Sequence, residues 1–430
     1  MIVENLQNFK IKRTKNKSMT TYPGAALIGS LYESMGLRKK MDRELRLKKR
    51  ERGYSVSEYT LSLIGMIVAG GESLEDISMF DGDEGTRKLF GAERFPAANS
   101  LGEFLRRFES SLLIKLADYN TMLALKLHKL EKLDKITIDI DSTLIECYKE
   151  NAKRTYKGFY GYDPLLAMIA ETGSVIRGIF REGNQAPQAN NLSLLRQINR
   201  RLPKDIAKKY FRSDSAAYNH KVMKYCDGHN IRFTITAEQN SAVRGAAIAI
   251  NAEDWVPFED GHIAETVHVP GPDIRDSIAY RLIVQRTVQE QPDMFSGPYK
   301  YHAIITNMQE EWSPQNIVFH HRKRGKAENV IKENKYGFAL DKYPCSQLLA
   351  NSAFFQINLL AYNLCQLFKY QALPESWRTL SIKNLRYRLF NVAGYVSRHA
   401  RRLYLSLSEN YPYYSVFENA RYRILSLAYT

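Results

Sequence analysis

The chain has 430 residues, of which 44% are hydrophobic and 25% charged, a composition typical of a folded protein with two or three domains and unlike that of a disordered chain. Its 62 lysines and arginines outnumber its 46 aspartates and glutamates, which gives a formal net charge of +16 and indicates a polyanionic partner such as nucleic acid. The four cysteines are widely separated and the nine histidines form no HExxH pattern, so neither a disulfide framework nor a zinc site is expected.

The N-terminal part of the sequence has a basic arm followed by helical periodicity. Residues 1–18, MIVENLQNFKIKRTKNKS, lack the apolar core of a signal peptide. Ser55 with Glu58, and Ser100 with Glu103, have the spacing of helix-starting capping boxes. We therefore expect residues 1–130 to form a basic arm and an all-α DNA-binding region, although an ordinary helical bundle explains the same pattern equally well.

After about residue 134 the periodicity changes to that of strands. Three strand-like runs with short links predict an antiparallel meander, and helices and strands then alternate. The predicted elements are strands at 135–142, 164–171 and 174–181, a helix at 190–201, a strand at 208–214, a helix at 216–228 and a strand at 231–237.

The second half of the chain completes a recognisable order of elements. Residues 240–312 read as short strands and turns, and helical periodicity resumes at Ser313-Pro314 and continues to residue 335. This order predicts an α/β ribonuclease-H-like catalytic core at 131–239 and 313–345, with a β-rich insertion at 240–312 and C-terminal helices at 346–430. Amide side chains interrupt the apolar run 348–368, which therefore predicts a buried helix rather than a membrane span.

The stretch ITIDIDST at 136–143 places Asp139 and Asp141 on one face of a strand. Such a pair suits a DxDxT phosphatase, a metal-dependent nuclease or simply a solvated strand end. In a ribonuclease-H-like order, a carboxylate on the first strand converges with Asp214 and Glu328, and three carboxylates suit two Mg²⁺ ions about 3.5–4 Å apart. A phosphatase needs a downstream acidic motif, whereas DGDEG at 81–85 lies upstream, so that alternative is second.

Together these motifs resemble the DDE transposases of bacterial insertion sequences, specifically the subgroup with a β-rich insertion before the catalytic glutamate. The resemblance covers about residues 25–410 and rests on DIDST, RSDSAAY, REGN and a late Tyr-x₂-Arg-x₃-Glu-x₆-Lys signature. Arg324, Glu328 and Lys335 match that signature, while His321 replaces the tyrosine. Their spacing predicts one shared face of one helix.

The resemblance implies a role for each residue. The catalytic residues would be Asp141, Asp214 and Glu328, which would also be the ligands of two Mg²⁺ ions or of Mn²⁺ in their place. Asp139 would have a structural role next to these ligands without binding the metal itself. The implied DNA-binding residues are Arg324, Lys335, His321 and Arg212.

The resemblance also implies cut-and-paste transposition. The protein would bind terminal inverted repeats as a homodimer in a paired-end complex, cleave the ends and join their 3′-hydroxyls to target DNA. It would act in the bacterial cytoplasm, at the nucleoid, and no membrane partner is expected. The alternatives are a ribonuclease-H-like nuclease without strand transfer, a haloacid-dehalogenase-like phosphatase and a domesticated, non-catalytic DNA-binding protein. Trp255 suits either base stacking or the core of the insertion.

Overall fold

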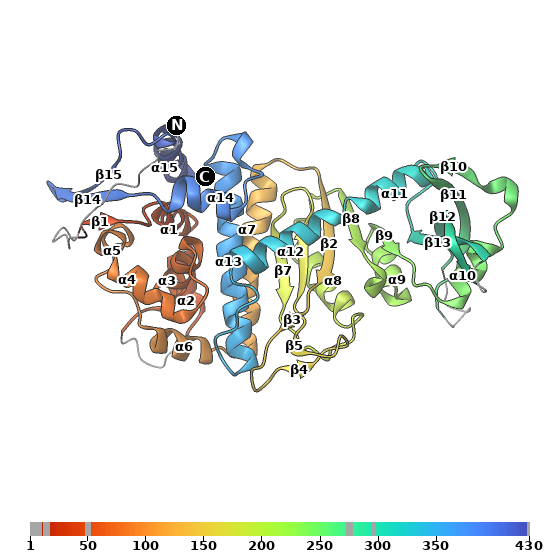
Figure 1. Ribbon diagram of the computed structural model, residues 1–430, viewed down its shortest axis with the longest axis horizontal. Helices are drawn as coiled ribbons and strands as arrows, with labels where there is room; N and C mark the ends of the chain where they lie inside the picture. The colour runs from red at the N-terminus through yellow and green to blue at the C-terminus, as the bar shows by residue number, and fades with distance from the viewer. Residues whose placement is uncertain (1–10, 12–17, 48–52, 272–277, 294–296, 428–430) are drawn as a thin grey trace.

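The computed structural model describes residues 11, 18–47, 53–271, 278–293 and 297–427. The molecule is elongated, with a helical body at one end, a large mixed sheet in the middle, and the remaining strands of that sheet at the other end (Figure 1). Most of the predicted basic arm lies outside the described residues. Within the described residues, no helix is long and apolar enough to cross a membrane.

The helical body begins with seven helices. The capping box predicted at Ser55 is confirmed, since its hydroxyl accepts from the Glu58 amide and the Glu58 carboxylate accepts from the Ser55 amide at 2.7 Å. The second predicted box is wrong, because the helix begins earlier, at Ala98, and the Ser100 hydroxyl bonds to Tyr59 instead. The helices are α1 Ala25–Ser34, α2 Leu37–Glu44, α3 Val56–Ala69, α4 Ile77–Gly82, α5 Glu84–Phe90, α6 Ala98–Arg106 and α7 Ser110–Leu130.

The central strands follow the predicted order. Strands β2, β6 and β7 form the antiparallel meander, although a small three-stranded sheet interrupts the chain between β2 and β6. On its other side β2 pairs parallel with β8, and β8 pairs parallel with β9. The elements are β2 Lys135–Ser142, β3 Ile145–Glu146, β4 Lys153–Arg154, β5 Tyr160–Tyr162, β6 Leu165–Ile169, β7 Val175–Ile179, α8 Asn191–Asn199, β8 Lys208–Ser213, α9 His220–Gly228 and β9 Ile231–Thr236.

The segment predicted as a β-rich insertion continues the same sheet. Strand β13 pairs antiparallel with β9, so β10 to β13 extend the central strands into one nine-stranded sheet. The segment also opens with a helix that the sequence analysis did not predict. Its elements are α10 Ser241–Ile248, β10 Val256–Phe258, β11 Gly261–His268, β12 Tyr280–Asp293 and β13 Gly297–Thr306.

The C-terminal region is only partly helical, so the prediction of helices throughout 346–430 is wrong. A hairpin of β14 (Gly394–His399) and β15 (Arg402–Leu407) turns at Ala400 and Arg401, whose φ angles of 46° and 64° fit a tight hairpin turn. Strand β1 (Met19–Thr20) pairs with β14, which gives the hairpin a third strand. The helices are α13 Leu348–Gln371, α14 Ile382–Leu385 and α15 Tyr414–Ser426.

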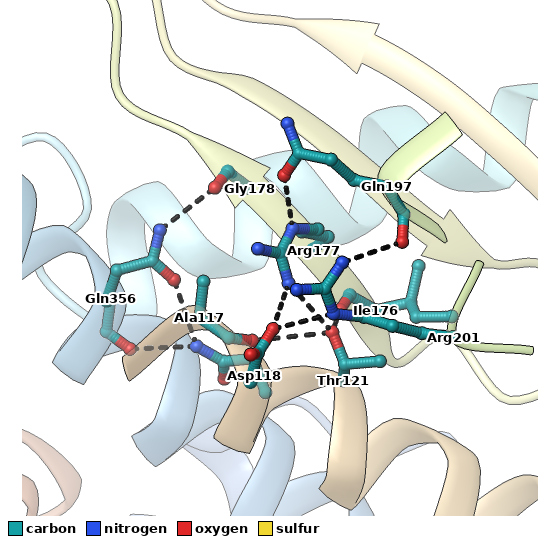
Figure 2. Close-up of polar contacts among 10 residues, drawn as sticks. Ala117, Asp118, Thr121, Ile176, Arg177, Gly178, Gln197, Arg201 and Gln356 are labelled. Carbon is teal, nitrogen blue, oxygen red and sulfur yellow. Dashed lines mark hydrogen bonds and ion pairs between the residues drawn. The ribbon is translucent and has the colours of Figure 1, made fainter. Parts of the chain in front are cut away.

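The polar side chains of α13 and α7 hydrogen-bond β7, the last strand of the sheet. The Asn363 amide accepts from Val175 N at 2.9 Å and donates to Val175 O at 2.8 Å. Gln356 donates to Gly178 O, and Thr121 of α7 donates to Ile176 O (Figure 2). These amides explain why α13 is apolar yet interrupted by polar residues: they take the place of a neighbouring strand.

Replacing Asn363 with alanine should therefore destabilise the protein strongly. The change leaves two buried backbone groups of Val175 and the side-chain oxygen of Asn120 without a partner, which should lower the free energy of unfolding by about 2–4 kcal/mol. Chemical denaturation measures this loss. The exposed Asn316 provides the control, because its replacement by alanine should change stability by less than about 0.5 kcal/mol. Equal effects of the two substitutions would contradict the edge-sealing role.

Candidate active site

Two aspartates lie at the ends of neighbouring parallel strands, at the same edge of the sheet: Asp141 near the end of β2 and Asp214 directly after β8. The register pairs Asp139 with Arg212 and Ile140 with Ser213, so the next residues along the two strands are Asp141 and Asp214. Adjacent strands lie about 4.8 Å apart, which brings these two residues together. The Asp214 carboxylate also accepts from the Ala216 amide at 3.0 Å and so caps the short turn of helix that follows β8.

The Asp141 carboxylate is partly buried, with 17% of its side chain exposed. Burial raises the pKa of Asp141 to about 6, and the negative charge of Asp214 contributes in the same direction. The cation Arg324 and the Ser142 amide lower the pKa and offset part of this effect. Two carboxylates that repel each other in a poorly solvated place are a suitable receptor for a divalent cation.

Glu328, the third predicted carboxylate, lies in the first turn of α12 (Gly325–Gly337), and 68% of its side chain is exposed. Arg324 lies between it and the aspartate: one guanidinium nitrogen is 3.2 Å from Asp141 and another is 3.9 Å from Glu328. Among the residues that the structure describes, no three histidine, cysteine or acidic side chains are close enough to share a metal ion. The structure thus brings Asp141 and Asp214 together and holds Glu328 apart through Arg324.

Asp139 faces a different environment from Asp141. It is 1% exposed, and its two oxygens accept from Arg212 at 2.6 and 2.7 Å. Arg212 is itself buried and donates a further bond to the His320 carbonyl at 2.7 Å. The pair therefore joins β2, β8 and the helix above them, and the position of Arg212 gives no support to the predicted DNA contact.

The predicted late helix is in fact two helices, so the prediction of one shared helical face is wrong for His321, which lies on the first helix, while Arg324 keeps its contact with Glu328 one turn further on. Helix α11 spans Pro314–Arg322, and Lys323 and Arg324 form a turn before α12 begins. Short-range bonds such as Ala327 N to Arg324 O, at 2.8 Å, tighten this junction. At this junction the Arg324 guanidinium lies 3.2 Å from the Asp141 carboxylate.

His321 is buried on α11. Its ring nitrogens lie 3.1 Å from the Thr234 hydroxyl and 3.0 Å from the Thr236 hydroxyl. Burial, together with the charge of Arg324, lowers the pKa of His321 to about 3, so the ring is neutral near neutral pH. A neutral, enclosed ring offers no charge to a phosphate, and the predicted DNA contact at His321 gains no support.

Lys335 lies in the last turn of α12 and contacts the loop that follows β2. Its ammonium group is 3.4 Å from the Thr143 hydroxyl and 3.3 Å from the Leu144 carbonyl.

The REGN motif, to which the sequence analysis gave no role, stabilises the residue next to Asp141. Arg181 forms a buried ion pair with Asp163, which in turn accepts a hydrogen bond from Ser142, the residue after Asp141.

Trp255 packs in the hydrophobic core beside the extended sheet, with 7% of its surface exposed. The Arg286 guanidinium covers its ring at 4.1 Å and also lies 4.6 Å from the centre of the Tyr299 ring. This stacked arrangement favours the core explanation over base stacking.

Residues 6–429 match the family model described as transposase DDE domain group 1. No curated protein matches the chain. Among solved structures, the chain is similar to the piggyBac transposase in a cryo-EM structure of its synaptic complex with hairpin DNA, with 14% sequence identity, a TM-score of 0.48, and coverage of 86% of this chain and 79% of that one.

The two aspartates of the DIDST motif should differ in their effect on stability. Asp139→Ala leaves the Arg212 charge buried without a partner and should lower the free energy of unfolding by about 3–5 kcal/mol. Asp141→Ala relieves repulsion from Asp214 and should leave stability close to that of the wild type. Thermal and chemical unfolding of both variants measure the contrast. Matching losses would show that the Asp139–Arg212 pair does not support the fold.

Proposed function

This chain belongs to the transposase DDE domain family, group 1, and on that premise we propose that it is a DNA transposase acting on its own insertion sequence. It binds the terminal inverted repeats, hydrolyses the DNA at each end and joins the freed 3′-hydroxyls to target DNA. The observation that carries the proposal is the placement of Asp141 and Asp214 at the ends of adjacent parallel strands, where burial and, after it, the negative charge of Asp214 raise the pKa of Asp141.

The strand arrangement supports a ribonuclease-H-like core. The order β7-β6-β2-β8-β9, antiparallel on one side of β2 and parallel on the other, is the arrangement expected from the predicted element order. We propose that residues 131–239 and 313–345 form this core, that 240–312 is its insertion, and that 1–130 and 346–430 form the flanking regions. The flanking helices share one set of buried apolar side chains, so the two regions fold together.

The donor groups fit a divalent cation in part. Carboxylate oxygens are the ligands that Mg²⁺ and Mn²⁺ prefer, and Asp141 and Asp214 supply them together. Glu328 is exposed on α12, so a change of side-chain rotamer would bring it toward the pair once Arg324 releases Asp141. We therefore propose Asp141, Asp214 and Glu328 as the residues that hold two such ions. When bound, these ions activate the attacking oxygen and neutralise the leaving one.

The surrounding residues have separate tasks in this proposal. Arg324, once freed from Asp141, presents a planar guanidinium to a DNA phosphate, and Lys335 positions the loop after Asp141 and adds a point charge. Asp139 and Arg212 keep β2 and β8 in register from within the core. The net charge of +16 suits a DNA partner. Pairing two DNA ends requires two copies of the protein, so we propose a homodimer on DNA. We also propose that the protein acts in the bacterial cytoplasm.

Each proposed metal ligand should be essential for cleavage and dispensable for binding. Asp141→Asn, Asp214→Asn and Glu328→Gln keep the side-chain shape but weaken metal binding, so cleavage of terminal-repeat DNA should fall by about a thousandfold or more. Electrophoretic assays with labelled ends measure cleavage and binding separately. Glu333→Gln, which alters another acid of α12, serves as the matched control and should still cleave.

Two outcomes would redirect the proposal. A Glu328→Gln protein that cuts at the wild-type rate would remove the glutamate from the site. When pre-cut ends are supplied, a transposase joins them to target DNA, whereas a nuclease or a non-catalytic binding protein leaves them unjoined. Intact ends then separate these two alternatives, because only the nuclease cuts them. The phosphatase alternative needs Asp139 as a nucleophile, and its buried pairing with Arg212 does not favour that role.

Metal binding should weaken in acid because of Asp141. Its pKa of about 6 means that the carboxyl is ionised above that pH and takes up a proton below it, where it can no longer ligate a cation well. The affinity for Mn²⁺ should therefore fall by up to about tenfold for each pH unit below about 6. Calorimetric titration across this range measures the effect. In Asp141→Asn this component of the pH dependence should be absent, and an unchanged profile would argue against Asp141 as a ligand.

A further inference from the structure

One face of β2 and β8 carries polar residues along its whole length. Alternate residues of a strand point to the same side, so each strand contributes a row that ends in one of the two site aspartates. The buried Asp139–Arg212 pair closes the middle of this face. The two rows are Lys135, Thr137, Asp139 and Asp141 on β2, and Lys208, Tyr210, Arg212 and Asp214 on β8.

The end of this face opposite the aspartates opens into a cleft of about 400 Å³ between the strands and the junction of α11 with α12. We call it the amino-edge groove, because it lies where the parallel strands begin. A smaller cleft of about 130 Å³ shares Lys208 and Tyr210 with it and adds Lys209 and Arg232. The cations that line the groove itself are Lys135, Lys208, Lys323 and Lys326, apart from the buried Arg212.

The acidic groups nearby do not cancel this charge. Asp134 lies 3.6 Å from Lys208, but both side chains are more than half exposed, so solvent screens the pair. Glu171 accepts from the Thr137 amide at 3.0 Å and from its hydroxyl at 2.7 Å. Arg212 is neutralised by Asp139. The four lysines therefore face only two acids, and the groove keeps a surplus of positive charge.

The wall of the groove is aromatic and fixed. Rings of Tyr210, Trp312 and His320 contact one another, with centroids 5.4 to 6.2 Å apart. Burial lowers the pKa of His320 to about 3, so its ring adds no charge near neutral pH. A packed aromatic wall beside four exposed lysines suits a partner with regularly spaced surface charges that needs no deep pocket.

We propose that the amino-edge groove binds the phosphate backbone of duplex DNA away from the cleaved bond. The inference rests on the proposed transposase function, which supplies DNA as the partner. Lys135 is six residues before Asp141 on β2, or about 20 Å at about 3.3 Å per residue, which corresponds to about six base pairs of duplex. The groove therefore holds a DNA segment distinct from the scissile phosphate.

Binding by the full-length protein to a random-sequence duplex, without divalent metal, tests the proposal. The logarithm of the binding constant falls with the logarithm of the salt concentration, and each phosphate contact that is lost makes this slope shallower by about 0.9. Lys135→Gln and Lys208→Gln should each lower this slope by about 1, and the double variant by about 2. Lys221→Gln is the control, because Lys221 is exposed on α9, which packs on the other face of the sheet.

The outcomes separate clearly. Unchanged slope and affinity in the double variant, with an unchanged thermal midpoint, would overturn the groove as a DNA site. Competition by polyglutamate as strong as that by duplex DNA would also overturn it, since an acidic protein would then be the better partner. Because the assay measures binding without cleavage, its failure leaves the proposed function standing, and a protein without transposase activity could still give a positive result.

Discussion

The last strand of the sheet sets the main constraint on this structure. Strand β7 has a neighbouring strand on one side only, and its other backbone edge must be hydrogen-bonded or exposed to water. Asn363, Gln356 and Thr121 supply these bonds from two long helices that lie side by side (Figure 1). Figure 2 shows the bonds of Gln356 and Thr121. Because both helices also pack within the helical body, the same contacts that seal the sheet attach it to the rest of the molecule.

Order at the site follows from a second buried interaction. The Asp139–Arg212 pair crosses from β2 to β8 two residues before the two aspartates, so it fixes the register in which they meet. A buried ion pair of this geometry is costly to break, because either partner alone would be an unpaired charge. The two aspartates of the DIDST motif thus differ: Asp139 is buried and links the two strands, whereas Asp141 is partly exposed beside Arg324.

The sequence predicted features that depend on neighbours close along the chain. The meander and the Ser55 capping box both follow from such local patterns. The break at Arg324 was not predictable in this way, since helical periodicity continues through it. The hairpin β14–β15 lies within the region predicted to be helical, although part of its sequence, LYLSL at 403–407, alternates like a strand. Nor could the sequence show that β13 would join β9, because that pairing links distant segments.

The pairing of β1 with β14 has a consequence for work with shortened chains. The Ser18 carbonyl accepts from Val396 N at 2.7 Å, and α15 near the C-terminus packs against α1 near the N-terminus. A fragment ending at residue 130 would lose α13 and α15 and expose apolar faces that they cover in the intact protein. Deletion mapping would then attribute lost DNA binding to missing contacts when the cause is a core cut in two, so point substitutions in the full chain are the sounder way to locate them.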